Sequence, residues 1–257
     1  MSGETEAIHE HHWEVSWAPI VAAVGITLLV PMGFSAYFVY EAPLAAALFA
    51  GLGTPLVLAG IAKWIQEGAT QKLAIENIAD LGIGVFIISE ILIFLSLFAS
   101  YWMMRISAGQ DGLPWPPAGT PEISLVLPAI MTVILVASSV TYHLGEMKME
   151  GGDIAGFRTW LSLSILLGLG FFGFTVYEYA HLTEQGFIPG TNSYSTAFYS
   201  LTGFHGAHVL LGVITFVIVF IASTRLAIHG MLVKAVGIYW HFVDIIWFFV
   251  ASQVYLW

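Results

Sequence analysis

The sequence predicts an all-α, polytopic membrane protein with seven transmembrane helices, in which helices one and two are splayed from a five-helix bundle. Of the 257 residues, 58% are hydrophobic and only 9% are charged, and the mean hydropathy is +0.85. A helix needs roughly 20 apolar residues to cross a bilayer. Stretches of that length lie at approximately 17–40, 43–66, 80–104, 123–146, 157–181, 199–224 and 234–256.

Charge and cysteine content exclude several classes of protein. The formal net charge is −10, with seven Lys and Arg. This argues against nucleic acid as a partner, because nucleic acid is held through basic contacts to phosphate. The absence of cysteine excludes disulfides, thiolate metal sites, iron–sulfur clusters and cysteine nucleophiles.

The chain divides into an acidic N-terminal tail at 1–16, helices one and two at 17–75, and helices three to seven at 76–257. The tail, MSGETEAIHEHHWEVS, lacks the basic start, short apolar core and small-residue cleavage site of a secretory signal. The first span is therefore expected to act as an uncleaved membrane anchor.

Basic residues predict the orientation. Arg105 falls at a connection on one side, and the other six basic residues fall on the side of the N-terminus. These six are Lys63, Lys72, Lys148, Arg158, Arg225 and Lys234. Lys and Arg near span ends are retained on the cytoplasmic side, or on the matrix side in a mitochondrion. We therefore expect the N-terminus inside and the C-terminus outside.

The first two spans contain Pro31 and Pro55. A proline removes a backbone hydrogen bond from a helix interior, so both helices are expected to be kinked and to lean away from the other five.

The third span carries a carboxyl group, Glu90, within GVFIISEILIFLSLF. It lies near the midplane, where an ionised carboxylate costs at least about 2.5–3.5 kcal/mol. Glu90 is therefore expected to face protein or water, or to hold a proton. Two interpretations stay open: a proton-exchanging or partner-bonding site, and a neutral acid that is hydrogen-bonded for packing. Ser89 and Ser96 are candidate hydrogen-bond partners.

Spans four and five hold polar residues near their ends. His143 lies near the inner end of span four. Glu178 and His181, three residues apart near the outer end of span five, are expected to pair at the membrane interface. The glycine-rich stretch 168–173 predicts close helix packing.

In the sixth span, GFHGAHVLLG places His205 and His208 on adjacent rows of one helix, with glycines that allow a neighbour to approach. Haem ligation requires histidines on facing helices at matching depth, and His143 lies near the opposite end of its span. Interhelical hydrogen bonding is therefore favoured over a metal or haem site.

In the seventh span, YWHFVDIIWFF forms a polar and aromatic stripe. Trp240, Asp244 and Trp247 follow helical spacing, and His241 reaches the face of Asp244. A helix-packing latch, in which the carboxylate accepts a hydrogen bond from the imidazole, is favoured. A proton path or a contact with another subunit stays open.

The motifs FIISEILIF, GFHGAHV and YWHFVDIIWFF resemble, in order and spacing, subunit III of cytochrome c oxidase, a haem-copper terminal oxidase. The resemblance covers spans three to seven and includes PPAGTPE before span four, Ser138–Ser139, His143 and Glu178–Tyr179. Spans one and two match mainly in position and in the Lys63–Trp64 pair.

The resemblance implies a noncatalytic core subunit of a proton-pumping oxidase in a bacterial or archaeal plasma membrane or the mitochondrial inner membrane. Electrons from cytochrome c would reduce oxygen at haem and copper centres on other chains. This chain would pack directly on subunit I in a complex that includes subunit II, hold phospholipid in a cleft beside helices one and two, and support proton uptake and stability during turnover.

By the same resemblance, Glu90 matches a buried, carbodiimide-reactive carboxyl group, and no catalytic or metal-binding residue is expected. The buried polar or proton-linked candidates are Glu90, Asp244, His241, His205 and His208. The lipid-binding candidates are Trp64, Glu90 and Arg225.

Three other classes of protein are less favoured by the sequence. The related subunit of quinol oxidases commonly lacks the first two helices, so seven spans favour the cytochrome c type. A retinal protein needs a lysine inside the last span, whereas Lys234 lies at the first residue of that span. A transporter is suggested by the proline-interrupted spans and midplane acids, but no comparable interruption recurs in spans four to seven.

Overall fold

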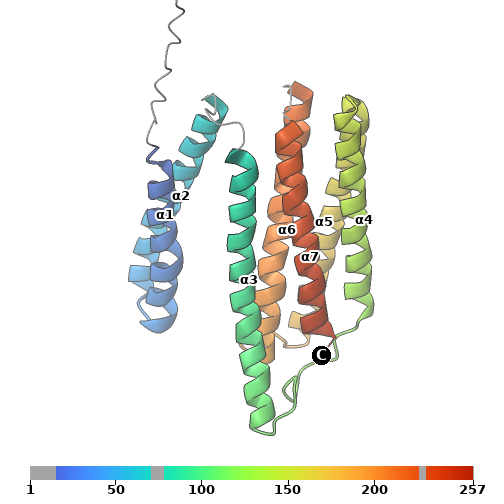
Figure 1. The fold of residues 1–257 in the computed structure, drawn as a ribbon. Coiled ribbons are helices and arrows are strands. Elements are labelled where there is room, and N and C mark those ends of the chain that lie inside the picture. The colour runs from blue at the N-terminus through green and yellow to red at the C-terminus, as the bar shows by residue number, and fades with distance from the viewer. Residues whose placement is uncertain (1–15, 71–77, 226–229, 257) are drawn as a thin grey trace, which may run out of the picture. The chain divides into compact units, whose positions relative to one another are not determined.

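The structure, a computed structural model, describes residues 16–70, 78–225 and 230–256. Throughout these residues the regular secondary structure is helical, and seven helices are long and apolar enough to cross a membrane. The predicted all-α fold with seven spans is therefore confirmed (Figure 1). The chain forms two compact units, which meet in sequence between Glu76 and Asn77.

The first unit is a pair of helices. Helix α1 (Ala18–Thr27) continues through two π-helical segments, η1 (Leu28–Met32) and η2 (Ser35–Val39), and α2 (Pro43–Thr70) follows. Pro31 lies inside η1, where the wider turn accommodates a residue that cannot donate a backbone hydrogen bond. Pro55 lies inside α2, which remains α-helical across it. Of the two prolines at which a kink is predicted, Pro31 coincides with a change of helix type, whereas the helix type is unchanged at Pro55.

Helices α1 and α2 contact each other through small residues. A methyl group built on Gly25 would lie 2.6 Å from the backbone nitrogen of Val57, and one built on Gly60 would lie 2.7 Å from that of Ala22. Membrane helices associate largely through van der Waals contact, which small residues make possible by letting two backbones approach closely.

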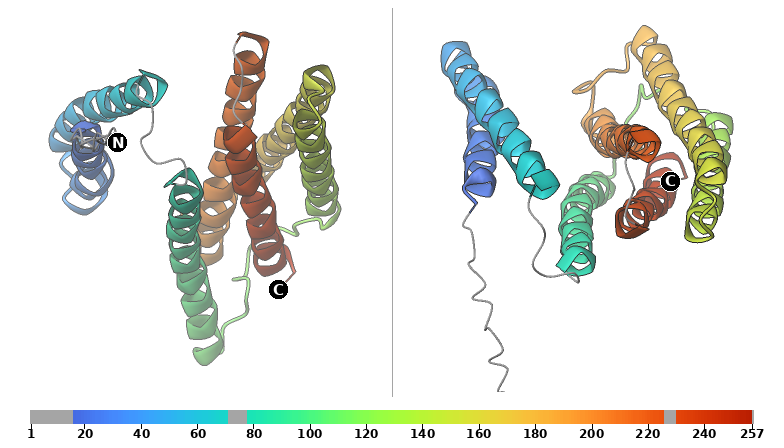
Figure 2. Two further views of the ribbon diagram at one scale, coloured as in Figure 1. Left: turned by 45° about the horizontal axis from the view of Figure 1, so that its top comes forward. Right: turned by 90° about the horizontal axis from the view of Figure 1, so that it is seen from above.

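The second unit is a five-helix bundle of α3 (Ile78–Gln110), α4 (Val126–Glu150), α5 (Ile154–Glu184), α6 (Ser193–Arg225) and α7 (Gly230–Tyr255). Helix α7 packs against α3, α4 and α6 and lies between α3 and α4, as Figure 2 shows from above. Helix α5 packs against α4 and α6. Helix α6 also packs against α3, so α6 and α7 each contact three helices of the bundle.

Several helices continue beyond the apolar stretches that predicted them. Helices α3 and α6 have 33 residues each, which at 1.5 Å per residue corresponds to about 50 Å. The hydrocarbon core of a bilayer is only about 30 Å thick. Hydropathy marks the part of a helix inside the hydrocarbon, whereas the helix itself ends only where its backbone is capped.

Two such caps begin α5 and α6. The Asp153 carboxylate accepts a hydrogen bond of 2.8 Å from Gly156 N and lies 3.4 Å from Lys148 Nζ. The backbone bond from Gly156, with a smaller contribution from Lys148, holds the Asp153 pKa below its usual range. At α6, Ser195 N donates to Asn192 Oδ1 at 2.7 Å and Asn192 N donates to Ser195 Oγ at 2.9 Å, a reciprocal cap.

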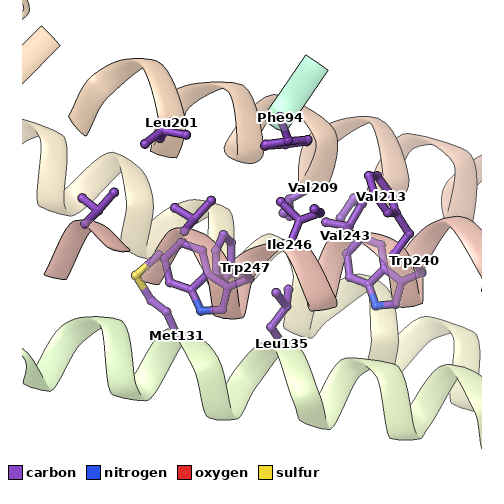
Figure 3. Packing of buried hydrophobic residues seen from close by; sticks show 14 of the residues in the cluster. Phe94, Met131, Leu135, Leu201, Val209, Val213, Trp240, Val243, Ile246 and Trp247 are labelled. Atoms are coloured by element: carbon purple, nitrogen blue, oxygen red, sulfur yellow. The ribbon is translucent and has the colours of Figure 1, made fainter. Parts of the chain in front are cut away.

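The core of the bundle is built around two tryptophans of α7, Trp240 and Trp247 (Figure 3). Each indole donates a hydrogen bond to a hydroxyl group of α4: Trp240 Nε1 to Ser138 Oγ and Trp247 Nε1 to Thr132 Oγ1, both at 2.9 Å. A buried indole N–H requires an acceptor, so these bonds fix the register of α7 against α4.

Candidate functional site

The first polar site of the bundle joins α3 to α6. Glu90 Oε2 lies 2.9 Å from His208 Nε2, and the side chains of Glu90 and His208 are only 14% and 8% exposed. The carboxyl group in the third span therefore has a titratable partner from the sixth span.

The second nitrogen of the His208 ring determines how many protons this pair holds. His208 Nδ1 lies 2.8 Å from the carbonyl oxygen of Phe204. A carbonyl can only accept, so Nδ1 carries a hydrogen. The Nε2–Oε2 bond then contains one proton, either on the imidazole beside a carboxylate or on the carboxyl group beside a neutral imidazole. The pair is neutral in both forms.

Aromatic rings surround this pair. Phe94 and Phe204 lie with their ring centroids 5.2 and 4.7 Å from that of His208. Tyr239 of α7 donates a hydrogen bond of 3.0 Å to the backbone carbonyl of His208. Residues of three helices thus contact His208.

The partner of Glu90 differs from the one expected. Ser89 and Ser96 donate instead to backbone carbonyl groups of their own helix, those of Phe86 at 2.7 Å and Ile93 at 2.6 Å. No signal within the third span indicates His208. The axial offset of α3 against α6, visible in Figure 1, brings the two residues to one level.

The second polar site joins α4 to α7. Ser139 Oγ donates a hydrogen bond to Asp244 Oδ2 and lies 3.0 Å from His241 Nδ1. Asp244 is 7% exposed, whereas His241 is half-buried. The stripe predicted on α7 therefore exists, but the serine of α4 connects the imidazole and the carboxyl group, in place of the expected direct bond.

His205 is fully buried between the rings of Phe171 and Trp247, at centroid distances of 5.6 and 5.1 Å. Within the described residues neither of its ring nitrogens has a hydrogen-bond partner. The interhelical hydrogen bond predicted for the two histidines of α6 is thus present for His208 and absent for His205 in this part of the chain.

Glu178 also has a different partner from the one expected. It is 5% exposed and accepts a hydrogen bond of 2.7 Å from the Tyr255 hydroxyl. His181 pairs with Gln185, at 2.9 Å between Nε2 atoms. The prediction of an interfacial Glu178–His181 pair is wrong, because the Glu178 carboxylate is hydrogen-bonded to Tyr255 of α7 instead.

The remaining candidates concern metal and lipid. The described residues contain no group of three or more His, Cys, Asp or Glu side chains placed to hold a metal ion. Of the lipid-binding candidates, Glu90 belongs to the pair described above. The side chains of Trp64 and Arg225 lie outside the described residues.

The chain is similar to known proteins of one family. Residues 9–257 match the family described as Cytochrome c oxidase subunit III. The chain is 40% identical over 181 residues to cytochrome c oxidase subunit 3 of Thermostichus vulcanus, covering 68% of this chain and 86% of the relative. It is 38% identical over 182 residues to that of a Synechocystis species, covering 68% and 74%. For the protein of Corynebacterium diphtheriae the identity is 36% over 193 residues, covering 73% and 93%.

Proposed function

This chain belongs to the cytochrome c oxidase subunit III family, and we propose that it acts as a noncatalytic core subunit of the oxidase. Electrons from cytochrome c reduce oxygen to water at haem and copper centres on partner subunits. This chain packs directly on subunit I, in a complex that also holds subunit II. Its own tasks are to retain phospholipid, to support proton uptake and to stabilise the complex during turnover.

The donor set of the chain supports the noncatalytic role. Haem iron and copper are held by His, Cys or Met side chains that converge on the metal. The chain has no cysteine, and both ring nitrogens of His208 are engaged within the bundle. His205 lies between two aromatic rings. These residues do not fit a redox centre.

The observation that carries the proton-linked role is the Glu90–His208 bond. The bond holds one proton, which is shared between an acid and a base from two different helices. Both side chains are largely buried. The proton can move between the carboxyl group and the imidazole while the number of hydrogen bonds in the pair stays the same. This property suits a subunit that supports proton uptake by its neighbour.

Lipid retention and orientation have separate support. Val85, Ile88 and Leu92 stand exposed on one face of α3, an apolar surface that suits acyl chains. Trp64 and Arg225 remain candidates for contact with headgroups.

The six-to-one distribution of basic residues supports an N-terminus inside and a C-terminus outside. The quinol-oxidase alternative is not favoured, because the relatives named above are cytochrome c oxidase subunits.

The test is Glu90→Gln in the whole oxidase. The glutamine amide can still donate a hydrogen bond to His208 Nε2, so the complex should assemble and transfer electrons. It can no longer exchange the shared proton. We expect the rate of proton uptake or of turnover-dependent inactivation to change by less than about tenfold, or less than roughly 1.4 kcal/mol in activation free energy.

Glu178→Gln is the matched control, since it makes the same substitution at a buried acid that is bonded to Tyr255 and not to a histidine. It should leave the inactivation rate at the wild-type value. Complete loss of electron transfer in an assembled Glu90→Gln complex would contradict the noncatalytic assignment.

A further inference from the structure

A line of titratable groups runs along the seam between α4 and α7, separate from the Glu90–His208 pair. Asp244 and Ser139 form its deepest part, and His241 follows on the other side of the serine hydroxyl. Asp244 is 7% exposed, and His241 is half-buried. The seam therefore leads from the surface of the bundle to its interior.

Two further groups continue this line towards the end of α4 that carries Lys148. Glu146 Oε2 lies 3.6 Å from His143 Nδ1, and their side chains are 19% and 61% exposed. A Cβ atom built on Gly237 of α7 would lie 3.6 Å from Glu146 Oε1, so Glu146 reaches across to α7 one helical turn before His241.

Among the described residues, the Ser139 hydroxyl alone links His241 to Asp244: it lies 3.0 Å from His241 Nδ1 and donates a hydrogen bond to Asp244 Oδ2. A hydroxyl donates one hydrogen bond and accepts others. It can donate to the carboxylate while accepting from Nδ1–H, or donate to Nδ1 while accepting from a protonated carboxyl group. Both arrangements use the same atoms in the same positions.

Asp244 lacks the hydrogen-bond donors and the basic neighbour that a permanently ionised carboxylate needs in this position. Its Oδ1 atom is buried without a hydrogen-bond donor among the described residues, and no basic residue bonds to it there. A buried carboxylate with one oxygen unpaired is disfavoured against its neutral form. The seam thus ends at a group that is stabilised by taking up a proton.

We propose that Ser139, His241 and Asp244 form a proton relay, in which a proton taken up at His241 near the Glu146–His143 pair is stored on Asp244. The relay starts from ionised Asp244 and neutral His241 with its hydrogen on Nδ1. A proton binds to Nε2. The Nδ1–H bond then breaks as this hydrogen moves to Ser139 Oγ, and the original hydroxyl hydrogen moves to Asp244 Oδ2. One proton enters, and the charge of the cluster changes from −1 to 0.

Other titratable groups contact different parts of α7. Helix α6 contributes His208, which accepts through its carbonyl from Tyr239, and His205, which lies against Trp247. Helix α3 contributes Glu90 through His208, and α5 contributes Glu178 at Tyr255. Within the described residues none of these bonds to Asp244, whose side-chain bond comes from Ser139.

The relay deepens the proposed function and rests on it for the use of the proton, since a subunit that supports proton uptake can use such a store. Its chemistry is independent of that use. The test below reads the Asp244 carboxyl group itself, and therefore separates failure of the relay from failure of the proposed function.

The experiment is infrared difference spectroscopy of the purified oxidase after rapid mixing with D₂O. The C=O stretch of a protonated aspartic acid is assigned to Asp244 by its loss in Asp244→Asn. Should that variant not assemble, Asp244→Glu serves, because the band then no longer shifts on labelling with 13C-aspartate. In the wild type this band exchanges rapidly. In Ser139→Ala exchange should be at least about 10-fold slower, because the bridging hydroxyl is gone.

Ser139→Thr retains the hydroxyl and should restore rapid exchange. Ser138→Ala is the matched control, since it removes the neighbouring serine of α4, which bonds Trp240 instead, and it should exchange at the wild-type rate. The relay is disproved by the absence of a protonated band at Asp244, by wild-type exchange in Ser139→Ala, or by equal slowing in Ser138→Ala.

Discussion

At the scale of single residues, three acids of the bundle each have a hydrogen-bond partner on another helix. Glu90 bonds His208, Asp244 accepts from Ser139, and Glu178 accepts from Tyr255. The partners are 118, 105 and 77 residues apart in the sequence. Inside a membrane no water completes the hydrogen bonds of an acid, so position in the bundle decides which partner it meets.

Trp240 depends in a similar way on two glycines of neighbouring helices. A methyl group built on Gly212 would lie 2.5 Å from Trp240 Cζ3, and one on Gly168 would lie 3.2 Å from Cη2. The indole is held by its bond to Ser138 and cannot easily move away. The glycine-rich stretch that predicted close packing thus accommodates a ring as well as a neighbouring helix.

Gly212→Ala should therefore destabilise the subunit. Overpacking of a filled core typically costs about 1–3 kcal/mol, against a gain of roughly 1 kcal/mol from the higher helix propensity of alanine. We expect a lower midpoint of thermal unfolding for this chain within the oxidase, measured by loss of Trp fluorescence or by dissociation from the complex.

Gly170→Ala is the control for this prediction, because nothing lies within 4 Å of a methyl group built there. It should be neutral or slightly stabilising. An unchanged midpoint in Gly212→Ala would show that the Trp240 ring is not confined.

At the scale of helices, the pair α1 and α2 is organised by small residues at helical spacing. Gly53 and Gly60 lie seven residues apart and are buried on one face of α2, opposite Gly25 and Ala22 of α1. The atoms that a side chain would meet are largely backbone atoms. The two helices therefore have to separate if the face becomes larger.

Gly53→Val should increase the separation of α1 and α2. A methyl group at this position already lies 2.7 Å from Gly25 O and 2.8 Å from Leu29 N, and the size of the contacting side chains sets the interaxial distance. Spin labels at the exposed positions Ile20 and Leu58 should move apart by about 2 Å in a pulsed electron-resonance measurement.

Gly51→Val is the control on the same helix, because its built methyl group contacts nothing within 4 Å. The label distance should stay at the wild-type value there. The same distance in Gly53→Val would mean that the glycine face does not hold the pair together.

At the scale of the whole molecule, the distribution of basic residues predicts which connections face inside. The chain has no cysteine, so an introduced cysteine is the one thiol of this subunit. Glu150→Cys at the end of α4 should be labelled by a membrane-impermeant maleimide only from the inside, and Asp111→Cys, after α3, only from the outside. The modified chain is read on a gel after labelling of cells or of inverted vesicles.

Val133→Cys controls for reagent entry, since Val133 is exposed on α4 in the middle of a span and should remain unlabelled from either side. Labelling of Glu150→Cys from the outside would reverse the proposed orientation.

The chain by itself determined the class of protein, the seven helices and most of the polar residues that matter. Each of these follows from local properties: the length of an apolar stretch, the rarity of an acid within it, and the motifs around Glu90, His205 and Asp244. Helix ends were predicted less well, because capping residues such as Asp153 and Asn192 stand outside the hydrocarbon.

Only the tertiary structure decided the partners. It joined Glu90 to His208, placed Ser139 between His241 and Asp244, and gave Glu178 to Tyr255 in place of His181. The physical reason is that such a bond depends on the axial offset and rotation of one helix against another. The offset and rotation are determined by packing of many small and aromatic side chains at once, such as Trp240 between Gly168 and Gly212. They cannot be predicted from the sequence of one span alone.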